Sequence, residues 1–344
     1  MFCLALLQRL KYLFFSATCV MAISFDQSYI EPYLKDWLRC LIENNKAEQK
    51  LFDENQEFYV PFTGVQVKVL RLIYIICKHF DVEPQAKYMA IHILDRYWSK
   101  LFWELLSSHL SFLSPVASSS TSLNIPEFTI QQVCEKMKSQ AQIAVAICIQ
   151  IANKVESGLG LSQLKEILKL IDQEHEHSSM AVRSYELQVL KTLDFRFPQC
   201  LPIHAIELFL VHEELDSKPG MRETCLQLLD VSYMSHDEMF EQLFLLAQSK
   251  KYDKSEHKAR IYLRLEANMA FIAASVVVCA CFFHTLKPKF DTVASKLAKL
   301  IDVDPVDVFI MANILQNLVI EEEDYRPSSS GRLSRKIDEA ESSR

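Results

Sequence analysis

Charged side chains interrupt strongly apolar helical patterns at three distant places in the chain. They are Asp95, Lys154 and Glu186; Ala152 precedes the lysine and Glu156 follows it. Because an isolated polar group is costly to bury, these side chains need partners. They suit a small paired cluster at a helix junction. Alternatively, Lys154 and Glu186 stay half exposed and offer hydrogen bonds to a partner's backbone, or all are ordinary surface charges at helix ends.

A metal site or a catalytic centre is not expected. The segment Glu174-His175-Glu176-His177 follows Asp172, but histidines two residues apart do not share a helix face and no further ligand group accompanies them. We interpret it as a solvated loop, and Cys279 and Cys281 fail on the same spacing. The sequence contains no P-loop, Rossmann glycine pattern, nucleophile elbow or kinase signature. We therefore expect no enzyme, no catalytic residue, no metal, no cofactor and no small-molecule substrate.

The composition favours an all-α protein with about two domains. Of the 344 residues, 50% are hydrophobic and only 5 are glycine, which is too few for the many tight turns of a large sheet protein. The net charge of −7 and the lack of an evident basic stripe argue against direct DNA binding, so we expect DNA contact only through partners. The 10 cysteines are scattered without a paired framework, which predicts buried, reduced thiols in an intracellular protein.

Two apolar segments could be taken for membrane segments. Met1–Ile23 resembles a signal peptide or short anchor, but Gln8, Arg9 and Lys11 interrupt it and the remaining run is too short to span a bilayer. We expect Met21 to be the true start, with the leader an extension of the gene model. Residues 267–283 carry no charge, yet their many small residues suit a packed core helix better than a membrane span.

Hydrophobic periodicity predicts helices along most of the chain. The predicted helices span Tyr29–Asn45, Val65–Phe80, Gln85–Lys100, Gln132–Val155, Leu161–Ile171, Ala181–Leu193, Ile203–Glu214, Met221–Tyr233, Glu238–Gln248, Ala259–His284, Phe290–Leu300 and Pro305–Val319. The charged stretch Lys46–Glu57 is expected to be a solvated helix or a linker.

These features, in this order, resemble a cyclin box. In that family a central helix ends as Ala152-Asn153-Lys154-Val155-Glu156 does, and a later helix runs as Glu186 to Phe195 does. The resemblance implies two cyclin-like helical domains and no chemistry of their own. It also implies that Lys154, Glu186 and Glu156 face a partner kinase, which would be regulated allosterically through the helix whose Glu pairs with the ATP-binding Lys. Asp95 and Ala152 would be structural positions of the box.

The chain departs from cell-cycle cyclins in ways that also carry information. Gln66 stands at the structural position where the family has the Arg that pairs with the Asp of Asp95-Arg96, and Lys68 replaces an apolar member of the substrate-docking surface, which is therefore expected to be absent. A Ser-rich insertion lengthens the interval from Asp95 to Lys154. This insertion, the N-terminal helix and the string Met221 to Asp230 resemble the cyclin N-terminal-domain-containing proteins of meiosis.

That resemblance implies a nuclear protein on meiotic chromosomes that works with recombination proteins to mature crossovers at designated sites. The alternatives are a regulatory subunit that activates a cyclin-dependent kinase and a cyclin-fold transcription factor; the acidic balance counts against the latter. The expected division is a leader at 1–24, N-terminal helices at 25–60, the cyclin box at 61–200 with its insertion at about 105–128, a second cyclin-like domain at 201–320 and a disordered tail at 321–344.

Overall fold

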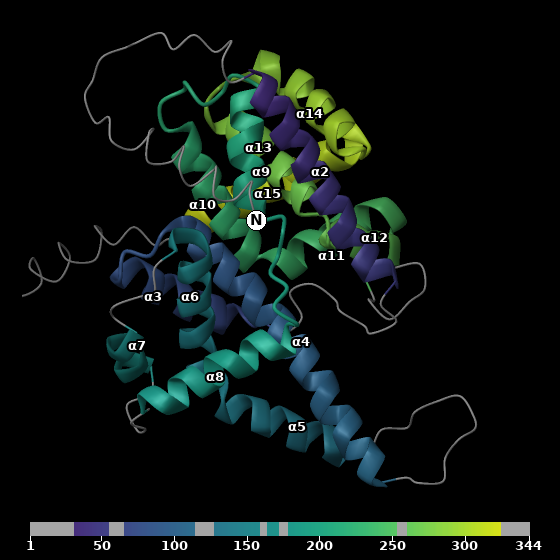
Figure 1. Cartoon of the computed structure of the whole chain (residues 1–344). Helices are drawn as coiled ribbons and strands as arrows, with labels where there is room; N and C mark the ends of the chain where they lie inside the picture. The colour runs from purple at the N-terminus through teal and green to yellow at the C-terminus, as the bar shows by residue number, and fades with distance from the viewer. Residues whose placement is uncertain are drawn as a thin grey trace, which may run out of the picture. The chain divides into compact units, whose positions relative to one another are not determined.

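The computed structural model describes residues 31–54, 65–113, 127–158, 164–171, 178–252 and 260–324. Every regular element in these ranges is a helix, and none of the described residues forms a strand, which confirms the all-α prediction (Figure 1). The leader at 1–24, residues 114–126 of the insertion, the segment 172–177 and residues 325–344 of the tail lie outside the described residues.

The chain divides into two compact units. The first comprises the residues up to Leu208 together with His257–Ala270, and the second comprises Phe209–Glu256 and the residues from Phe271 onward. The boundaries after Leu208 and after Ala270 both fall inside helices, so the units are separated by how the residues pack and not by linkers. The sequence-based domain bounds stay predictions.

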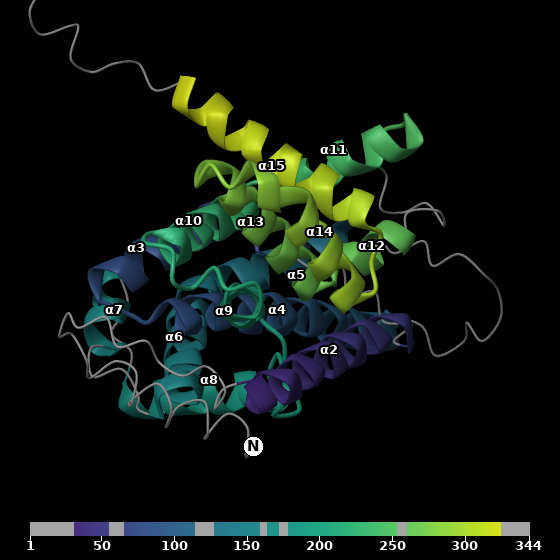
Figure 2. The same cartoon turned by 90° about the horizontal axis from the view of Figure 1, so that it is seen from above.

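The first unit is built around α6 (Ala141–Ser157), which lies against α4 (Pro84–Leu113) (Figures 1 and 2). Every residue from Ala144 to Ala152 is buried, as an apolar pattern on all faces requires. Gly158 ends α6 in the left-handed conformation, at φ 75°, which glycine adopts without steric cost. The other elements of this unit are α2 (Glu31–Glu54), α3 (Val67–His79), α5 (Glu127–Ser139), α7 (Leu164–Ile171), α8 (Ser179–Thr192), the start of α9 (Pro202–His212) and α12 (Arg260–Glu266).

The second unit is centred on α13 (Met269–Phe283), whose residues from Phe271 to Cys281 are all buried. This burial agrees with the predicted packed core helix. Within the described part of the chain, no helix has the length and apolar character needed to cross a membrane. In the same unit α15 (Pro305–Asp324) packs against α10 (Met221–Met234), α11 (His236–Gln248) and α14 (Lys287–Ile301).

Several predicted helix bounds were wrong. The stretch predicted as one helix over Gln132–Val155 is two, separated at Gln140, and the stretch Ala259–His284 is broken at Asn268. The second break is stabilised from far away, because Nδ2 of Asn45 on α2 donates to Oδ1 of Asn268 at 2.9 Å. The Asn45 carboxamide oxygen in turn accepts from the backbone N–H of Ala270 at 3.4 Å, which satisfies one of the unpaired donors at the start of α13.

Other helices run further than their patterns suggested. α2 continues through the charged stretch to Glu54, and α4 continues to Leu113, so the first part of the expected insertion is helical. The buried side chains of Leu101 and Leu106 keep α4 anchored beyond its predicted end. α15 takes in the first residues of the expected tail, since extending a helix adds one hydrogen bond for each residue fixed.

Candidate protein-binding site on α6 and α8

The structure brings Lys154 and Glu186 together, 32 residues apart in the chain. Lys154 Nζ on the last turn of α6 lies 2.5 Å from Glu186 Oε1 on α8. The lysine side chain is 42% exposed and the glutamate side chain 16% exposed, so the pair is reachable from solvent while the carboxylate is largely held in place. Ala152, two residues before the lysine, is fully buried. The half-exposed arrangement is therefore the one that forms.

Glu156, one turn along α6 from the buried Ala152, points inward. It is a buried residue, and its Oε1 lies 3.8 Å from Nε2 of His204 on α9. A carboxylate in this position ties the end of α6 to α9 when the imidazole is protonated. Contact between Glu156 and a partner stays a prediction, and in this structure such contact would need local movement.

Asp95 and Gln66, the two remaining positions assigned to the cyclin box, differ in burial. Asp95 on α4 is almost fully buried, whereas Gln66 is exposed at the N-cap of α3 and its side chain makes no capping hydrogen bond. Among the described residues, no hydrogen bond joins Gln66 to Asp95. The Arg-to-Asp pairing that the cyclin-box resemblance describes is thus not reproduced by glutamine here.

A pair of tyrosines fixes α8 and so positions Glu186. The hydroxyls of Tyr97 on α4 and Tyr185 on α8 are hydrogen-bonded at 3.2 Å, and the two rings meet edge to face with centroids 6.3 Å apart. Burial raises the pKa of both phenols above the ordinary value, so both stay neutral donors and acceptors. Val189 is the buried residue of α8, and Ser178 caps the helix by accepting from Ala181 N–H at 3.1 Å.

Beside the ion pair, α8 presents apolar side chains to solvent. Met180 is 81% exposed, and Leu187, seven residues later on the same face, is also exposed. Just beyond the helix, Phe195 is exposed and has a positive φ of 54°, which is unusual for a bulky residue. Large exposed apolar side chains on a helix that also carries a positioned polar group are typical of protein-binding surfaces.

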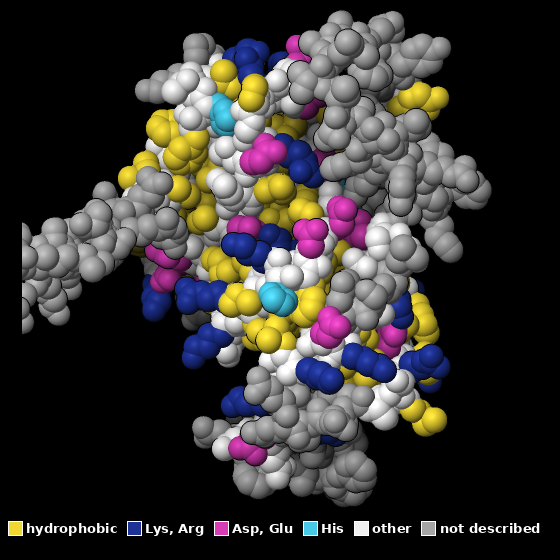
Figure 3. All heavy atoms as spheres, turned by 90° about the vertical axis from the view of Figure 1, so that its left-hand side faces the viewer, with side chains coloured by type: hydrophobic (Ala, Val, Ile, Leu, Met, Phe, Trp, Pro, Cys, Tyr) yellow, Lys and Arg dark blue, Asp and Glu magenta, His cyan; other side chains and the backbone are white. Residues whose placement is uncertain are grey.

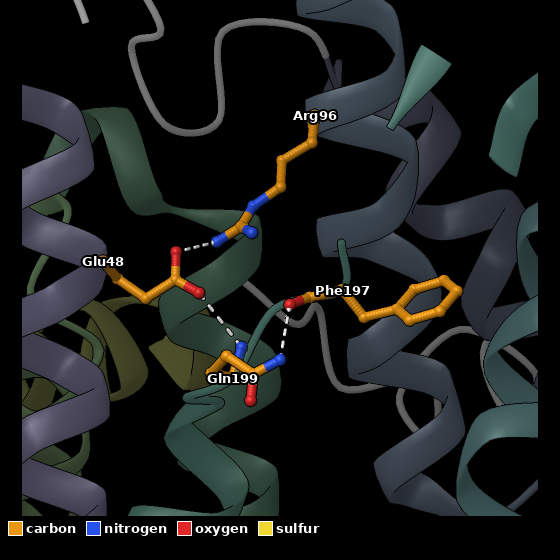
Figure 4. A network of polar contacts seen from close by, with 4 residues as sticks. All are labelled: Glu48, Arg96, Phe197 and Gln199. Carbon is orange, nitrogen blue, oxygen red and sulfur yellow. Dashed lines mark hydrogen bonds and ion pairs between the residues drawn. The ribbon is translucent and has the colours of Figure 1, made fainter. Parts of the chain in front are cut away.

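A second polar network, which the sequence analysis missed, attaches α2 to the rest of the first unit (Figure 4). Glu48 on α2 forms an ion pair with Arg96 on α4, and its other oxygen accepts from the backbone N–H of Gln199 at 3.0 Å. Gln199 Nε2 donates to the carbonyl of Phe197 at 3.1 Å. The only local signal was Arg96 in an apolar run, because Glu48 lies in a stretch that suggests a solvated surface.

Metal binding finds no support in the part of the chain that is described, where no group of three His, Cys, Asp or Glu residues is arranged to hold an ion. The candidate site is the Lys154–Glu186 ion pair, together with the exposed apolar side chains of α8. In this pair Lys154 Nζ is a hydrogen-bond donor and the Glu186 carboxylate an acceptor.

The class of the described structure is all-α, and its helices are consistent with a cyclin-like fold. The chain is similar to the protein named Cyclin N-terminal domain-containing protein 1 of Mus musculus, with 19% identity over 224 residues, and to that of Homo sapiens, with 21% identity over 229 residues. The matches cover 64% and 63% of this chain and 65% of each relative, so they span slightly less than two thirds of the relatives' length. No protein-family model matches the chain. The similarities support the resemblance stated from the motifs.

Proposed function

We propose that this chain is a non-enzymatic, cyclin-like protein that acts through protein contacts in meiotic recombination. In this role it promotes the maturation of crossover intermediates at designated sites on chromosomes in the nucleus. The observation that carries the protein-binding part is the half-exposed Lys154–Glu186 ion pair. The meiotic part rests on the sequence similarity described above.

The pair is suited to holding a partner's backbone. An ammonium group has three donors, and the Glu186 hydrogen bond uses one of them, while the carboxylate has further acceptor positions. Met180 and Leu187 supply apolar area that a partner would bury. DNA would be reached through the recombination proteins that this surface binds.

A second candidate function is a regulatory subunit that activates a cyclin-dependent kinase. What favours it is the pairing of Lys154 with Glu186, at the positions where the cyclin-box resemblance implies a kinase contact. The mechanism would be to hold the regulatory helix of the kinase so that its Glu can pair with the ATP-binding Lys. Both functions can use the same surface, so the identity of the bound partner distinguishes between them.

Charge reversal tests the surface in both functions. The variants Lys154→Glu and Glu186→Lys each place like charges together, and the matched controls Lys169→Glu and Glu166→Lys reverse exposed charges on α7. Since an exposed ion pair contributes only about 0–1 kcal/mol to stability, all four variants are expected to fold, which circular dichroism would check.

The readout is localisation in germ cells during meiotic prophase and co-purification with tagged kinases and recombination proteins. The proposal expects discrete foci on paired chromosomes for the intact chain and the α7 controls, and loss of foci for the α6 and α8 variants. Loss of a co-purified kinase in those two variants alone would favour the second function. Normal foci and unchanged partners in every variant would overturn the role of this surface.

A further inference from the structure

α3 carries a stripe of exposed cations with one apolar side chain inside it. Lys68, Arg71, Ile75 and Lys78 are all exposed, and their spacing of three, four and three residues places them on one face of the helix. Ile75 is 62% exposed. No acidic residue occurs anywhere in this helix, whose opposite side buries Leu70, Ile73, Ile76 and Cys77.

The charges of this stripe are not neutralised within the described part of the chain. Lys68, Arg71 and Lys78 form no ion pair or hydrogen bond there through their side chains. From α4, the Nζ of Lys87 lies 4.4 Å from the ring centroid of Tyr74, the α3 neighbour of Ile75. The nearby acids, Asp81 and Glu83, are exposed and follow the C-terminal end of α3.

The N-terminal end of the stripe does not favour the helix that carries it, because Lys68 lies in the first turn, whereas Lys78 in the last turn does favour it. Cations in the first turn oppose the helix dipole, which stabilises acids there, and the first turn of α3 has none. The N-cap residue Gln66 also makes no side-chain hydrogen bond to the helix. Local choices that weaken an element without a structural return are expected at functional positions.

Hydrophobic and cationic groups together select among ligands. Exposed Lys and Arg attract any polyanion, but the phosphates that they contact on a nucleic acid offer no apolar group to cover an exposed isoleucine. Ten residues of helix separate Lys68 from Lys78, a span of about 15 Å, which matches roughly three turns of a partner helix or four to five extended residues. On a chain of net charge −7, such a stripe is a local exception.

We propose that the α3 stripe docks an acidic segment of a partner protein, with one bulky apolar side chain of that segment covering Ile75. Carboxylates on either side of that side chain pair with Lys68, Arg71 and Lys78, so binding is electrostatic and weakens with salt. This surface is made of other residues than the α6–α8 ion pair, and it provides a contact beyond the function proposed above. No basic stripe was expected from the sequence, since the cations are dispersed in an apolar run.

The test uses the full chain and a displayed library of random peptides of about 16 residues, long enough to cover the roughly 15 Å stripe in either conformation. Selection is run in parallel on the intact chain, on the triple variant Lys68→Glu/Arg71→Glu/Lys78→Glu, and on a control. The control is Lys136→Glu/Lys138→Glu/Lys169→Glu, which reverses as many exposed charges on α5 and α7. Single peptides are then measured against Ile75→Ser and against a short DNA duplex as competitor.

The expected result is that the intact chain and the control select peptides rich in Asp and Glu around a bulky apolar residue. Their affinity should fall roughly tenfold or more in the stripe variant, because three exposed pairs are replaced by repulsions. Ile75→Ser should lower the affinity of the chain for the selected peptides and leave its binding of the DNA duplex unchanged. If intact and stripe-variant chains select the same peptides, the proposal is overturned. DNA binding that depends on the stripe but not on Ile75, without acidic peptides being selected, would identify a nucleic-acid surface instead.

Discussion

Truncating Glu48 should loosen the N-terminal helix from the first unit. Glu48→Ala removes both the ion pair to Arg96 and the acceptor of the Gln199 backbone N–H (Figure 4). The glutamate side chain is 13% exposed and the arginine side chain 22% exposed, so neither group is freely solvated in the intact chain. The variant removes this carboxylate from a partly buried guanidinium and leaves the Gln199 backbone N–H without its acceptor.

The size of the effect follows from these contacts. A hydrogen bond to a charged group contributes about 1.5–3 kcal/mol and a neutral one about 1 kcal/mol. Because Gln199 is exposed and Arg96 keeps some access to solvent, water recovers part of the loss. We expect a loss of about 2 kcal/mol, and about half of that for Glu48→Gln, which keeps one acceptor.

The chain offers a well-placed reporter for this measurement. Its three tryptophans are Trp37, Trp98 and Trp103, which lie on α2 and α4, so tryptophan fluorescence follows the first unit and the helices that Glu48 joins. With a urea slope of about 2 kcal/mol per molar, the fluorescence midpoint should fall by about 1 M.

Glu43→Ala is the matched control, because Glu43 is exposed on the same helix and forms no ion pair in the described part of the chain. It should stay within about 0.5 kcal/mol of the intact chain. An equal midpoint for Glu48→Ala and Glu43→Ala would refute the reasoning that this network holds α2.

Three further results are expected. Lys100 Nζ lies 2.8 Å from the Asp194 carboxylate and lowers the pKa of that carboxyl by hydrogen bonding and by its charge. The stabilisation from this pair is present above the ordinary Asp pKa and is lost as pH falls through the lowered pKa. In an NMR titration, the pKa of Asp194 should rise back toward its ordinary value in Lys100→Ala. Burial raises the pKa of Cys200 to about 12, so this thiol should resist labelling at neutral pH until the chain is unfolded. Ser178→Ala should cost about 1 kcal/mol through loss of the α8 cap and Ser178→Asp should not, as measured by urea unfolding.

The sequence predicted the helices whose signals are local. Apolar periodicity predicted helix starts at Gln85 and Ile203, each one residue from the observed starts of α4 and α9. The break at Asn268 could not be predicted this way, because its partner Asn45 lies 223 residues away. Isolated charges in apolar runs were a sound guide to Lys154 and Glu186, which do meet.

The α3 stripe and the Glu48 network were missed for opposite reasons. Along the sequence, Lys68, Arg71 and Lys78 are diluted by apolar residues, and only the winding of the helix brings them onto one face. Glu48 lies in a charged stretch that suggests solvent on all sides, yet it is held against α4. The composition of a segment averages over all faces of the helix that it forms, whereas a binding partner contacts only one of those faces.

The Lys154–Glu186 pair is difficult to explain by stability alone. Val189 and the Tyr97–Tyr185 contact already hold α8 against the first unit, and a pair whose lysine is 42% exposed adds at most about 1 kcal/mol. A smaller apolar residue at the end of α6 would cost less conformational entropy than an ordered lysine. An oriented donor and acceptor beside uncovered apolar side chains instead lowers the cost of ordering these groups when a partner binds. This comparison of costs supports the proposal that the ion pair serves recognition of a partner.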